Sequence, residues 1–296
     1  ARDLHVHVQR ATPSDLGRIL GLLENARRRY VNFGREDLPY LLQASHAACL
    51  LADTGPLVWG FACATSRLDP QSETLRIKAR WAYLRALALI NGWRLENGVP
   101  LLLEPLLSTL RGMQVDQVAC LAWEPWLERA LTTGPVPFRV HDHIISLERD
   151  CQRLPPHPTG PTTIRSARLS DVSTLLEIDN VAFDPLWAMT RQDLAGLLIS
   201  GVRSMIAELG GTPVGYALSS VEGVNGQVIR LAVRPEAQRQ GIGHQLLIDA
   251  LHFCAQAGAR WVSLNTQTSN HGSLRLYESV GFYPRGDEIT VLVRYL

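Results

Sequence analysis

The sequence predicts an α/β protein of the α+β kind, built from two tandem domains that are each a mixed, mostly antiparallel twisted sheet flanked by helices. Three observations point to this fold. Strand-like and helix-like patterns alternate along the chain, a proline-rich stretch interrupts them, and the parts on either side of it resemble each other. A length of 296 residues suits about two domains of ordinary size.

The composition narrows the class of protein. Hydrophobic residues make up 46% of the chain and charged residues 19%, so the chain has enough apolar residues to form hydrophobic cores. The formal net charge of +1 gives no general field for nucleic acid, so anion binding must be local and no nucleic-acid partner is expected. No apolar run approaches the roughly 18 residues of a membrane span, and the first residues lack an apolar signal core. We therefore expect a cytoplasmic protein without a membrane partner.

The cysteines are five in number, lie far apart and form no CxxC pair. Such a set is typical of reduced, mostly buried thiols, so neither disulfides nor a metal site is expected.

A candidate boundary lies in the stretch RDCQRLPPHPTGPTT, at residues 149–163. Four prolines and a glycine oppose regular structure there, as in an interdomain linker. We expect a first domain at 1–150, a linker at 151–162 and a second domain at 163–296.

The two halves repeat three blocks in the same order. Residues 8–20 match 164–176, and each block reads as a strand, a Ser-Asp helix start and a helix. Residues 50–64 match 205–219 as strand, tight turn and strand. Residues 87–122 lie without a gap on 231–266. This order predicts duplication of one unit that ends in a terminal pair of strands.

A glycine turn in the second copy precedes a helix. The stretch VIRLAVRPEAQRQGIGHQLL (228–247) contains an apolar strand, then Gln238 and Arg239, then Gly241 and Gly243. Apolar residues from Leu246 to Cys254 recur with helical spacing, and Gly258 suits the helix end before the strand 261–266. A helix start offers unpaired N–H groups and partial positive charge, and glycine lets a phosphate approach them. An ordinary strand-to-helix turn would also use glycine, so the turn alone leaves both readings open.

A second motif, TSNHGSLRLYESVGF (268–282), places Asn270, Ser273 and Tyr277 on one helix face before Gly281 and Phe282. With the turn Gln238-x-x-Gly241-x-Gly243, this segment resembles the GCN5-related N-acetyltransferase (GNAT) superfamily over about residues 162–296. The dinucleotide fingerprint and the P-loop, two other phosphate motifs, do not fit these residues.

The resemblance implies a role for each motif. The cosubstrate would be acetyl-CoA, with its pantetheine arm paired to the backbone of the strand and its pyrophosphate at the turn. Asn270 would face the pantetheine arm, and Tyr277 would act as general acid for the departing thiolate. The implied coenzyme-binding residues are Leu231, Ala232, Val233, Gln238, Arg239, Gln240, Gly241, Ile242, Gly243, His244, Asn270 and Tyr277.

The general base is left open by the sequence. Where relatives carry a glutamate, this chain has Gln227 or Asn265, and neither takes up a proton at neutral pH. Glu222 is the candidate we name, in a loop that could reach the acceptor, with Glu177, Asp179 and Asp184 as others. A water relay, or loss of the proton of the amine to solvent, is an alternative.

The first copy lacks the motifs. Gln238, Gly241 and Gly243 fall on Arg94, Asn97 and Val99, while Asn270 and Tyr277 fall on Trp126 and Thr133. A β-branched residue at Val99 resists positive φ, and Pro100 removes an N–H donor. We expect a degenerate first domain without a cofactor site, making the chain a monomeric pseudo-dimer or a homodimer.

The acceptor is not named by these motifs. The tandem layout is similar to that of mycothiol synthases, and the second half is similar to ribosomal-protein acetyltransferases. We expect N-acetyl transfer to a primary amine of a small molecule or peptide; the alternative is a non-catalytic, regulatory acyl-CoA-binding protein. The insertion 66–85 has basic and aromatic residues that either contact an acceptor or form a solvated hairpin.

Overall fold

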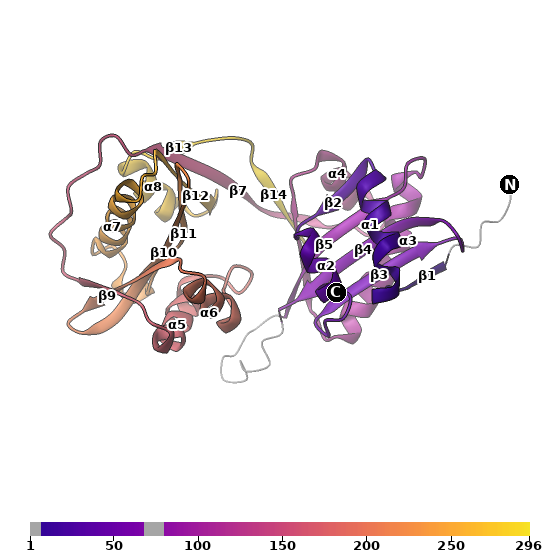
Figure 1. The fold of residues 1–296 in the computed structure, drawn as a ribbon, viewed down its shortest axis with the longest axis horizontal. Helices are drawn as coiled ribbons and strands as arrows, with labels where there is room; N and C mark the ends of the chain where they lie inside the picture. The colour runs from indigo at the N-terminus through magenta and orange to yellow at the C-terminus, as the bar shows by residue number, and fades with distance from the viewer. Residues whose placement is uncertain (1–6, 68–79) are drawn as a thin grey trace. The chain divides into compact units, whose positions relative to one another are not determined.

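A computed structural model describes residues 7–67 and 80–296 of the chain (Figure 1). It divides into two compact units. Unit 1 comprises Ala1–Asp142 together with Ile289–Leu296, and unit 2 comprises His143–Glu288. The chain therefore passes from unit 1 to unit 2 once and returns to unit 1 for its last residues.

Unit 1 contains one sheet with helices on both faces. Its strands run in the order β1-β3-β4-β5-β6-β14, and β2 also pairs with β5. The strands are β1 (His7–Arg10), β2 (Arg28–Val31), β3 (Ala47–Asp53), β4 (Val58–Ser66), β5 (Trp81–Leu89), β6 (Gln117–Ala122) and β14 (Ile289–Tyr295). The helices are α1 (Leu16–Asn25), α2 (Leu38–Leu41), α3 (Leu95–Gly112) and α4 (Pro125–Thr133).

Unit 2 repeats this plan. Its strands run in the order β7-β12-β11-β10-β9-β8, and β13 also pairs with β7. The strands are β7 (Arg139–Asp150), β8 (Thr163–Ser166), β9 (Arg203–Leu209), β10 (Thr212–Glu222), β11 (Asn225–Val233), β12 (Trp261–Gln267) and β13 (Tyr283–Pro284). The helices are α5 (Val172–Ala182), α6 (Arg191–Ile199), α7 (Ile242–Gln256) and α8 (His271–Ser279).

Successive side chains of a strand point to opposite faces of the sheet, and helices cover both faces of each sheet. In unit 2, Tyr216 and Leu218 pack with α5 and α6, whereas Ala217 between them packs with α7. Figure 1 shows α5 and α6 on one side of the strands and α7 on the other. In the described pairings of both units, only β5–β6 and β11–β12 are parallel. The mixed, mostly antiparallel fold predicted from the sequence is confirmed.

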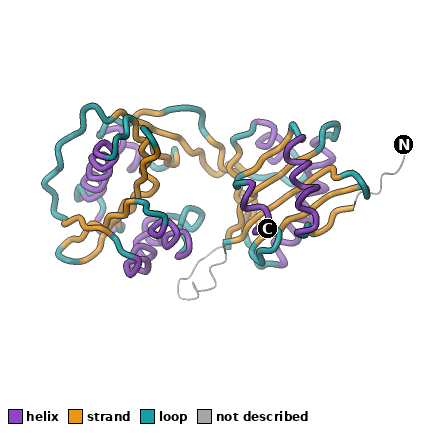
Figure 2. The backbone as a smooth tube through the Cα atoms, viewed as in Figure 1, coloured by secondary structure: helices purple, strands orange, loops and turns teal. Residues whose placement is uncertain are grey.

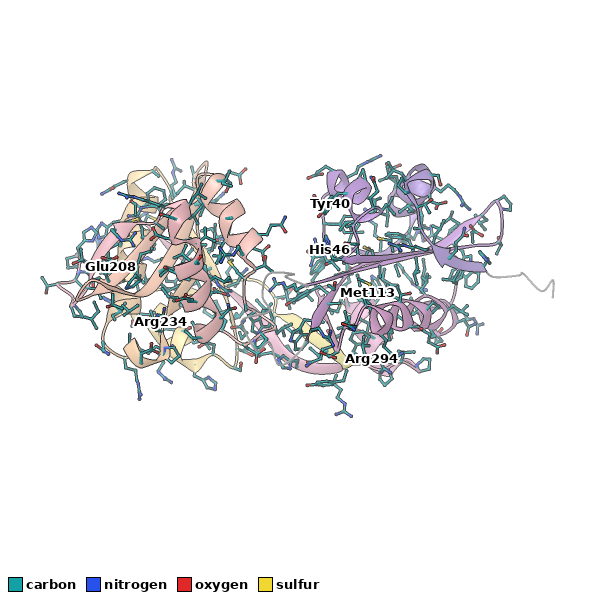
Figure 3. The ribbon with its side chains drawn as sticks, turned by 90° about the horizontal axis from the view of Figure 1, so that it is seen from below. Tyr40, His46, Met113, Glu208, Arg234 and Arg294 are labelled. Carbon is teal, nitrogen blue, oxygen red and sulfur yellow. The ribbon has the colours of Figure 1, made fainter. Side chains whose placement is uncertain are left out.

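The final strand of each sheet comes from the other half of the sequence. β14 pairs with β6 from Thr290 opposite Ala122 to Tyr295 opposite Gln117. β7 pairs with β12 from Trp261 opposite Asp150 to Gln267 opposite Ile144. Arg294 on β14, which is labelled in Figure 3, also donates a hydrogen bond to the Pro137 carbonyl inside unit 1.

The compact units therefore differ in extent from the sequence-based domains, which end at residue 150 and at residue 296. Segment 151–162 contains neither helix nor strand (Figure 2). Of the insertion 66–85, Ser66 ends β4 and Trp81–Arg85 begin β5, while 68–79 lie outside the described residues.

The parallel strand pair of each unit opens into a fork. β11 pairs with β12 only over Asn225–Gln227, and β5 pairs with β6 only over Trp81–Tyr83. Beyond these residues the strands separate, which leaves a free backbone edge on β11 in unit 2, whereas β2 pairs with the corresponding edge of β5 in unit 1. This fork positions the site described next.

Candidate functional site

A cavity of about 550 Å³ lies in unit 2 beside the open edge of β11. Its walls come from the end of β11, the turn before α7, the start of α8 and the end of α5. The structure brings together nine of the residues that the sequence singled out: Leu231, Ala232, Val233, Gln238, Arg239, Gly241, Gly243, His244 and Asn270. The two sequence motifs, separated by about thirty residues, thus line one space.

The turn before α7 has an unusual backbone. Arg239 has a φ of 61° and Gly241 a φ of 82°, both in the left-handed region. A Cβ on Gly241 would meet no heavy atom within 4 Å, so the backbone conformation rather than lack of space favours glycine there. A non-glycine residue such as Arg239 is held in this region at a cost of about 1 kcal/mol or more, and such strain gathers at functional sites.

The turn leaves donors free for an anion. The N–H groups in the first turn of α7 have no carbonyl within the helix to bond, and the helix dipole favours negative charge there. Gln238 is not such a donor, because its side-chain amide binds the Val233 carbonyl at 3.0 Å and closes the turn. A Cβ on Gly243 would lie 3.4 Å from Leu276 and 3.8 Å from Val233, two residues that line the cavity.

The helix α8 carries the second motif. Asn270 caps it, since its side-chain oxygen accepts the Ser273 N–H at 3.2 Å. Ser273 lines the cavity, whereas Tyr277 is buried one turn further along, with its ring edge-on to Phe282. Burial raises the pKa of Tyr277 above its ordinary value of 10, and a hydrogen bond with Ser273 and the charge of Arg230 lower the pKa in part. Ser273 therefore both lines the cavity and forms a hydrogen bond with the phenol.

Four expected residues do not line the cavity: Tyr277, described above, and Gln240, Ile242 and Glu222. Gln240 is exposed and its side-chain amide donates to the Glu236 carbonyl, and Ile242, the first residue of α7, is buried. Glu222 is the last residue of β10, paired with Asn225 at the hairpin turn. Since Tyr216 pairs with Ala232 at the cavity, Glu222 lies about 20 Å away along the strand.

The other side chains considered at the position of the base, including the non-basic Asn265, already have hydrogen-bond or ion-pair partners. The Asn265 side chain accepts a hydrogen bond from Ser146 on β7 at 2.8 Å. Glu177 pairs with Arg234, and Asp184 accepts the Leu186 N–H. Among the described residues that line the cavity, none is an Asp or Glu.

Asp179 was expected in an accessible position and is instead fully buried, with 0% of its surface exposed. Arg230 on β11 binds both of its carboxylate oxygens at 2.8 Å, and the Tyr216 hydroxyl and Met189 N–H also donate to it. With these bonds made, the carboxylate has no room for an amine. A signal in the sequence pointed to this: Val172, Leu175 and Asp179 follow the apolar spacing of α5, where a charge needs a partner.

The matching fork in unit 1 is filled by the chain itself. β2 pairs with β5 from Arg28 opposite Leu89 to Val31 opposite Ala86. These β5 residues match the stretch of β11 that borders the unit 2 cavity. In unit 1, β2 therefore pairs with the strand edge that is open at the corresponding place in unit 2. Tyr30 of β2 is fully buried there.

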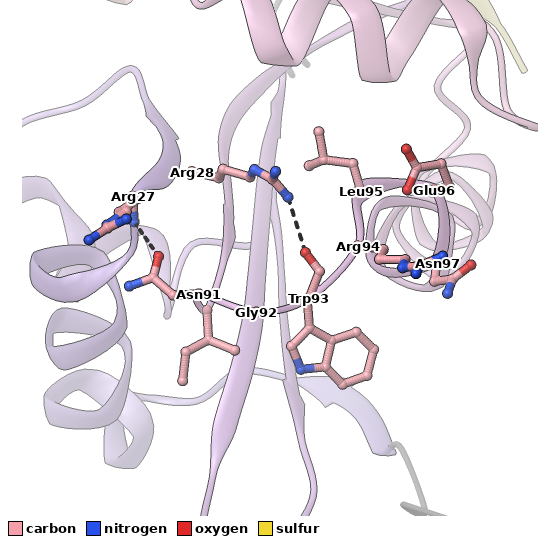
Figure 4. Close-up of a pocket in the computed structure, with 10 residues that line it drawn as sticks. Arg27, Arg28, Asn91, Gly92, Trp93, Arg94, Leu95, Glu96 and Asn97 are labelled. Atoms are coloured by element: carbon pink, nitrogen blue, oxygen red, sulfur yellow. Dashed lines mark hydrogen bonds between the residues drawn. The ribbon is translucent and has the colours of Figure 1, made fainter. Parts of the chain in front are cut away.

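Unit 1 also has a cavity of about 690 Å³, at the start of α3 (Figure 4). The Arg28 guanidinium donates to the Trp93 carbonyl across it, and the Asn91 side chain accepts the Arg27 N–H. The helix α3 begins at Leu95 and already includes Asn97 and Val99, the positions that match Gly241 and Gly243. The turn is therefore helical in unit 1, and it lacks the left-handed residues found in unit 2.

Comparison with known proteins identifies the family that this chain resembles. The model of the acetyltransferase (GNAT) family matches residues 172–282, which include both motifs. The chain is 35% identical over 134 residues to the N-alpha-acetyltransferase RimI of Mycobacterium tuberculosis, covering 42% of this chain and 80% of that protein. It is 29% identical over 174 residues to the mycothiol acetyltransferase of Tsukamurella paurometabola, covering 52% of this chain and 59% of that protein.

A solved structure shares the fold over the whole chain. The tandem GNAT protein from the clavulanic acid biosynthesis pathway has a TM-score of 0.62 and 15% identity, and the match covers 98% of both chains. No helix of the described residues has the length and apolarity required to cross a bilayer. Motifs, fold and relatives agree: the chain belongs to the GCN5-related N-acetyltransferase (GNAT) superfamily, in its tandem form, and is an acyltransferase.

Proposed function

We propose that the protein transfers an acetyl group from acetyl-CoA to a primary amine of a small molecule or peptide, at the cavity of unit 2. The observation that carries this proposal is the open edge of β11 next to the unpaired N–H groups of α7. A pantetheine arm carries amide groups that suit a free strand edge, and a pyrophosphate suits a helix start. The residues present therefore fit the coenzyme.

The reaction forms a C–N bond and breaks the C–S bond of the thioester. Backbone N–H groups of Leu231–Val233 would polarise the carbonyl as charge develops on its oxygen. Tyr277, with Ser273 beside it, would supply the hydrogen bond or proton for the departing thiolate. The proton of the amine would go to solvent, because the described cavity wall carries no carboxylate.

The acceptor class follows from the relatives rather than from the cavity. Two of them are named N-alpha-acetyltransferase and mycothiol acetyltransferase, so peptide N-termini and amine-bearing small molecules are the first acceptors to test.

Release of CoA thiol against a panel of such amines tests the proposal, with the Gly243→Val variant as the control that blocks the site. We expect thiol release that depends on one class of amine and is lost in the variant. Acetyl-CoA binding without amine-dependent thiol release would contradict acetyl transfer.

A further inference from the structure

The ion pair between Asp179 and Arg230 is buried beside the cavity, and the proposed reaction does not use it. Its side chains are 0% and 13% exposed. Charges are kept in such a place only when they are paired and hydrogen-bonded, and here both carboxylate oxygens accept from the guanidinium.

The pair holds the segment that joins α5 to α6, residues 183–190. The Arg230 guanidinium donates to the Trp187 carbonyl at 2.7 Å, and Asp179 accepts the Met189 N–H at 2.7 Å. The same guanidinium lies 3.5 Å from the ring centroid of Phe183, a cation–π contact. One buried side-chain pair thus fixes the beginning and the end of this segment.

Phe183 is at the same time a wall of the cavity. The turn before α7 and the residues Leu231–Val233 bind the phosphate and pantetheine parts of the coenzyme under the proposed function. The acyl group then lies further from the turn, toward Arg230, where the Phe183 ring rests on the guanidinium.

We propose that Phe183 is a specificity-determining residue that limits the acyl chain to a short one, and that Arg230 and Asp179 are the residues that position it. This inference rests on the proposed function. An aromatic ring held on one face by a buried guanidinium has little freedom to move aside for a longer chain.

Calorimetric titration of the full chain with CoA, acetyl-CoA and hexanoyl-CoA tests the inference without knowledge of the acceptor. For Phe183→Ala we expect the preference for acetyl-CoA over hexanoyl-CoA to fall by about tenfold or more, because a phenyl group is removed from the acyl end. The affinity for CoA itself stays within about twofold, since the groups that hold it are unchanged.

Phe253→Ala is the matched control. Phe253 on α7 also lies under an arginine, with Arg203 at 4.8 Å from its ring centroid, but it does not line the cavity. This variant loses the same side-chain atoms and should keep the wild-type ratio of acetyl-CoA to hexanoyl-CoA affinity.

Asp179→Asn tests the positioning role. Like Phe183→Ala, it should lower the preference for acetyl-CoA over hexanoyl-CoA. If this variant does not fold, Tyr216→Phe removes one hydrogen bond to Asp179 and keeps the ion pair. An unchanged ratio in Phe183→Ala would overturn the specificity role, and equal weakening of all three ligands in Asp179→Asn or Tyr216→Phe would overturn the positioning role. Failure of the wild type to bind any of the three would instead overturn the proposed function.

Discussion

Single residues set the backbone conformation of the turn before α7, where the proposed function places the pyrophosphate. Gly241 is at a φ of 82°, and Gly258 at the end of the same helix is at 93°; a Cβ on either would meet no heavy atom within 4 Å. The two positions share the conformational demand for glycine, but only Gly241 lines the cavity.

Gly241→Ala is therefore expected to weaken acetyl-CoA binding by about tenfold, because strain of about 1–2 kcal/mol is relieved by moving the N–H groups out of place. Gly258→Ala should lower the free energy of unfolding by a similar amount and leave the affinity unchanged. Calorimetry and thermal unfolding of both variants measure this. Equal loss of affinity in both would show that the turn acts through stability alone.

Tyr277 is the residue on which the chemistry of the thiolate depends in the proposed reaction. Tyr277→Phe should lower kcat by about a hundredfold, in the range of general acid catalysis, with little change in acetyl-CoA affinity. Because burial raises the pKa of Tyr277 above 10, the phenol stays protonated at neutral and mildly alkaline pH.

The raised pKa of Tyr277 determines the expected pH profile of the activity. Activity that needs the protonated phenol is retained below the raised pKa and lost only as the pH passes above it, so no descending limb due to Tyr277 should appear below about pH 10. Measuring kcat from pH 6 to 9.5 checks this. A descending limb near pH 8 that disappears in Tyr277→Phe would contradict it.

At the scale of elements, the two units differ in what occupies the fork of their sheets. In unit 1, β2 pairs with β5 over Ala86–Leu89, and α3 extends through the positions of the glycine turn. In unit 2, the corresponding edge of β11 borders the cavity. A strand already paired has no backbone groups left for a ligand.

This difference predicts one acetyl-CoA site per chain. Gly243→Val copies the residue found at the matching position of unit 1, Val99, and its branched side chain would enter the space between Leu276 and Val233. We expect it to abolish measurable binding in calorimetry, while Arg94→Ala in unit 1 leaves the stoichiometry and the affinity unchanged. A second site that persists in Gly243→Val would refute this assignment.

At the scale of the whole molecule, the last strand of each unit is supplied by the other half of the sequence. The side chains of Val291, Leu292 and Val293 on β14 are at most 2% exposed, and they complete the sheet of unit 1. Removing residues 289–296 would expose the edge of β6 and lose about 1.5–3 kcal/mol for each of these side chains.

We therefore expect unit 1 of the truncated chain to unfold at a lower temperature than in the full chain, and unit 2 to keep its acetyl-CoA binding. Two-stage thermal unfolding with and without acetyl-CoA measures both effects, since ligand raises the stability only of the unit that binds it. Loss of coenzyme binding together with unit 1 would contradict the division into units 1–142 with 289–296, and 143–288.

Much of the fold followed from patterns local in the sequence. The alternation of strands and helices, the repeated blocks and the two motifs each involve neighbouring residues, and periodicity and turn chemistry act over that range. Nine residues named from those motifs line one cavity, because each lies at a defined end of an element, whereas Gln240, Ile242 and Tyr277 do not line it. Their roles in coenzyme binding stay a prediction. The motifs gave no partner for Asp179, although its place in the apolar spacing of α5 was a signal that this carboxylate is buried.

The sequence by itself determined the tandem α/β plan, the family and the glycine turn, because short-range geometry and apolar spacing specify them. Only the tertiary structure showed that Asp179 is buried against Arg230 and that Glu222 lies at the far end of its hairpin. It also showed that β2 pairs with the edge of β5 that would otherwise be open in unit 1. Finally, it showed that β7 completes the sheet of unit 2 and β14 completes the sheet of unit 1. These features depend on pairing between residues far apart in the chain. The residues around a strand edge or a charged side chain do not identify its partner, because that partner comes near only when the whole sheet has formed.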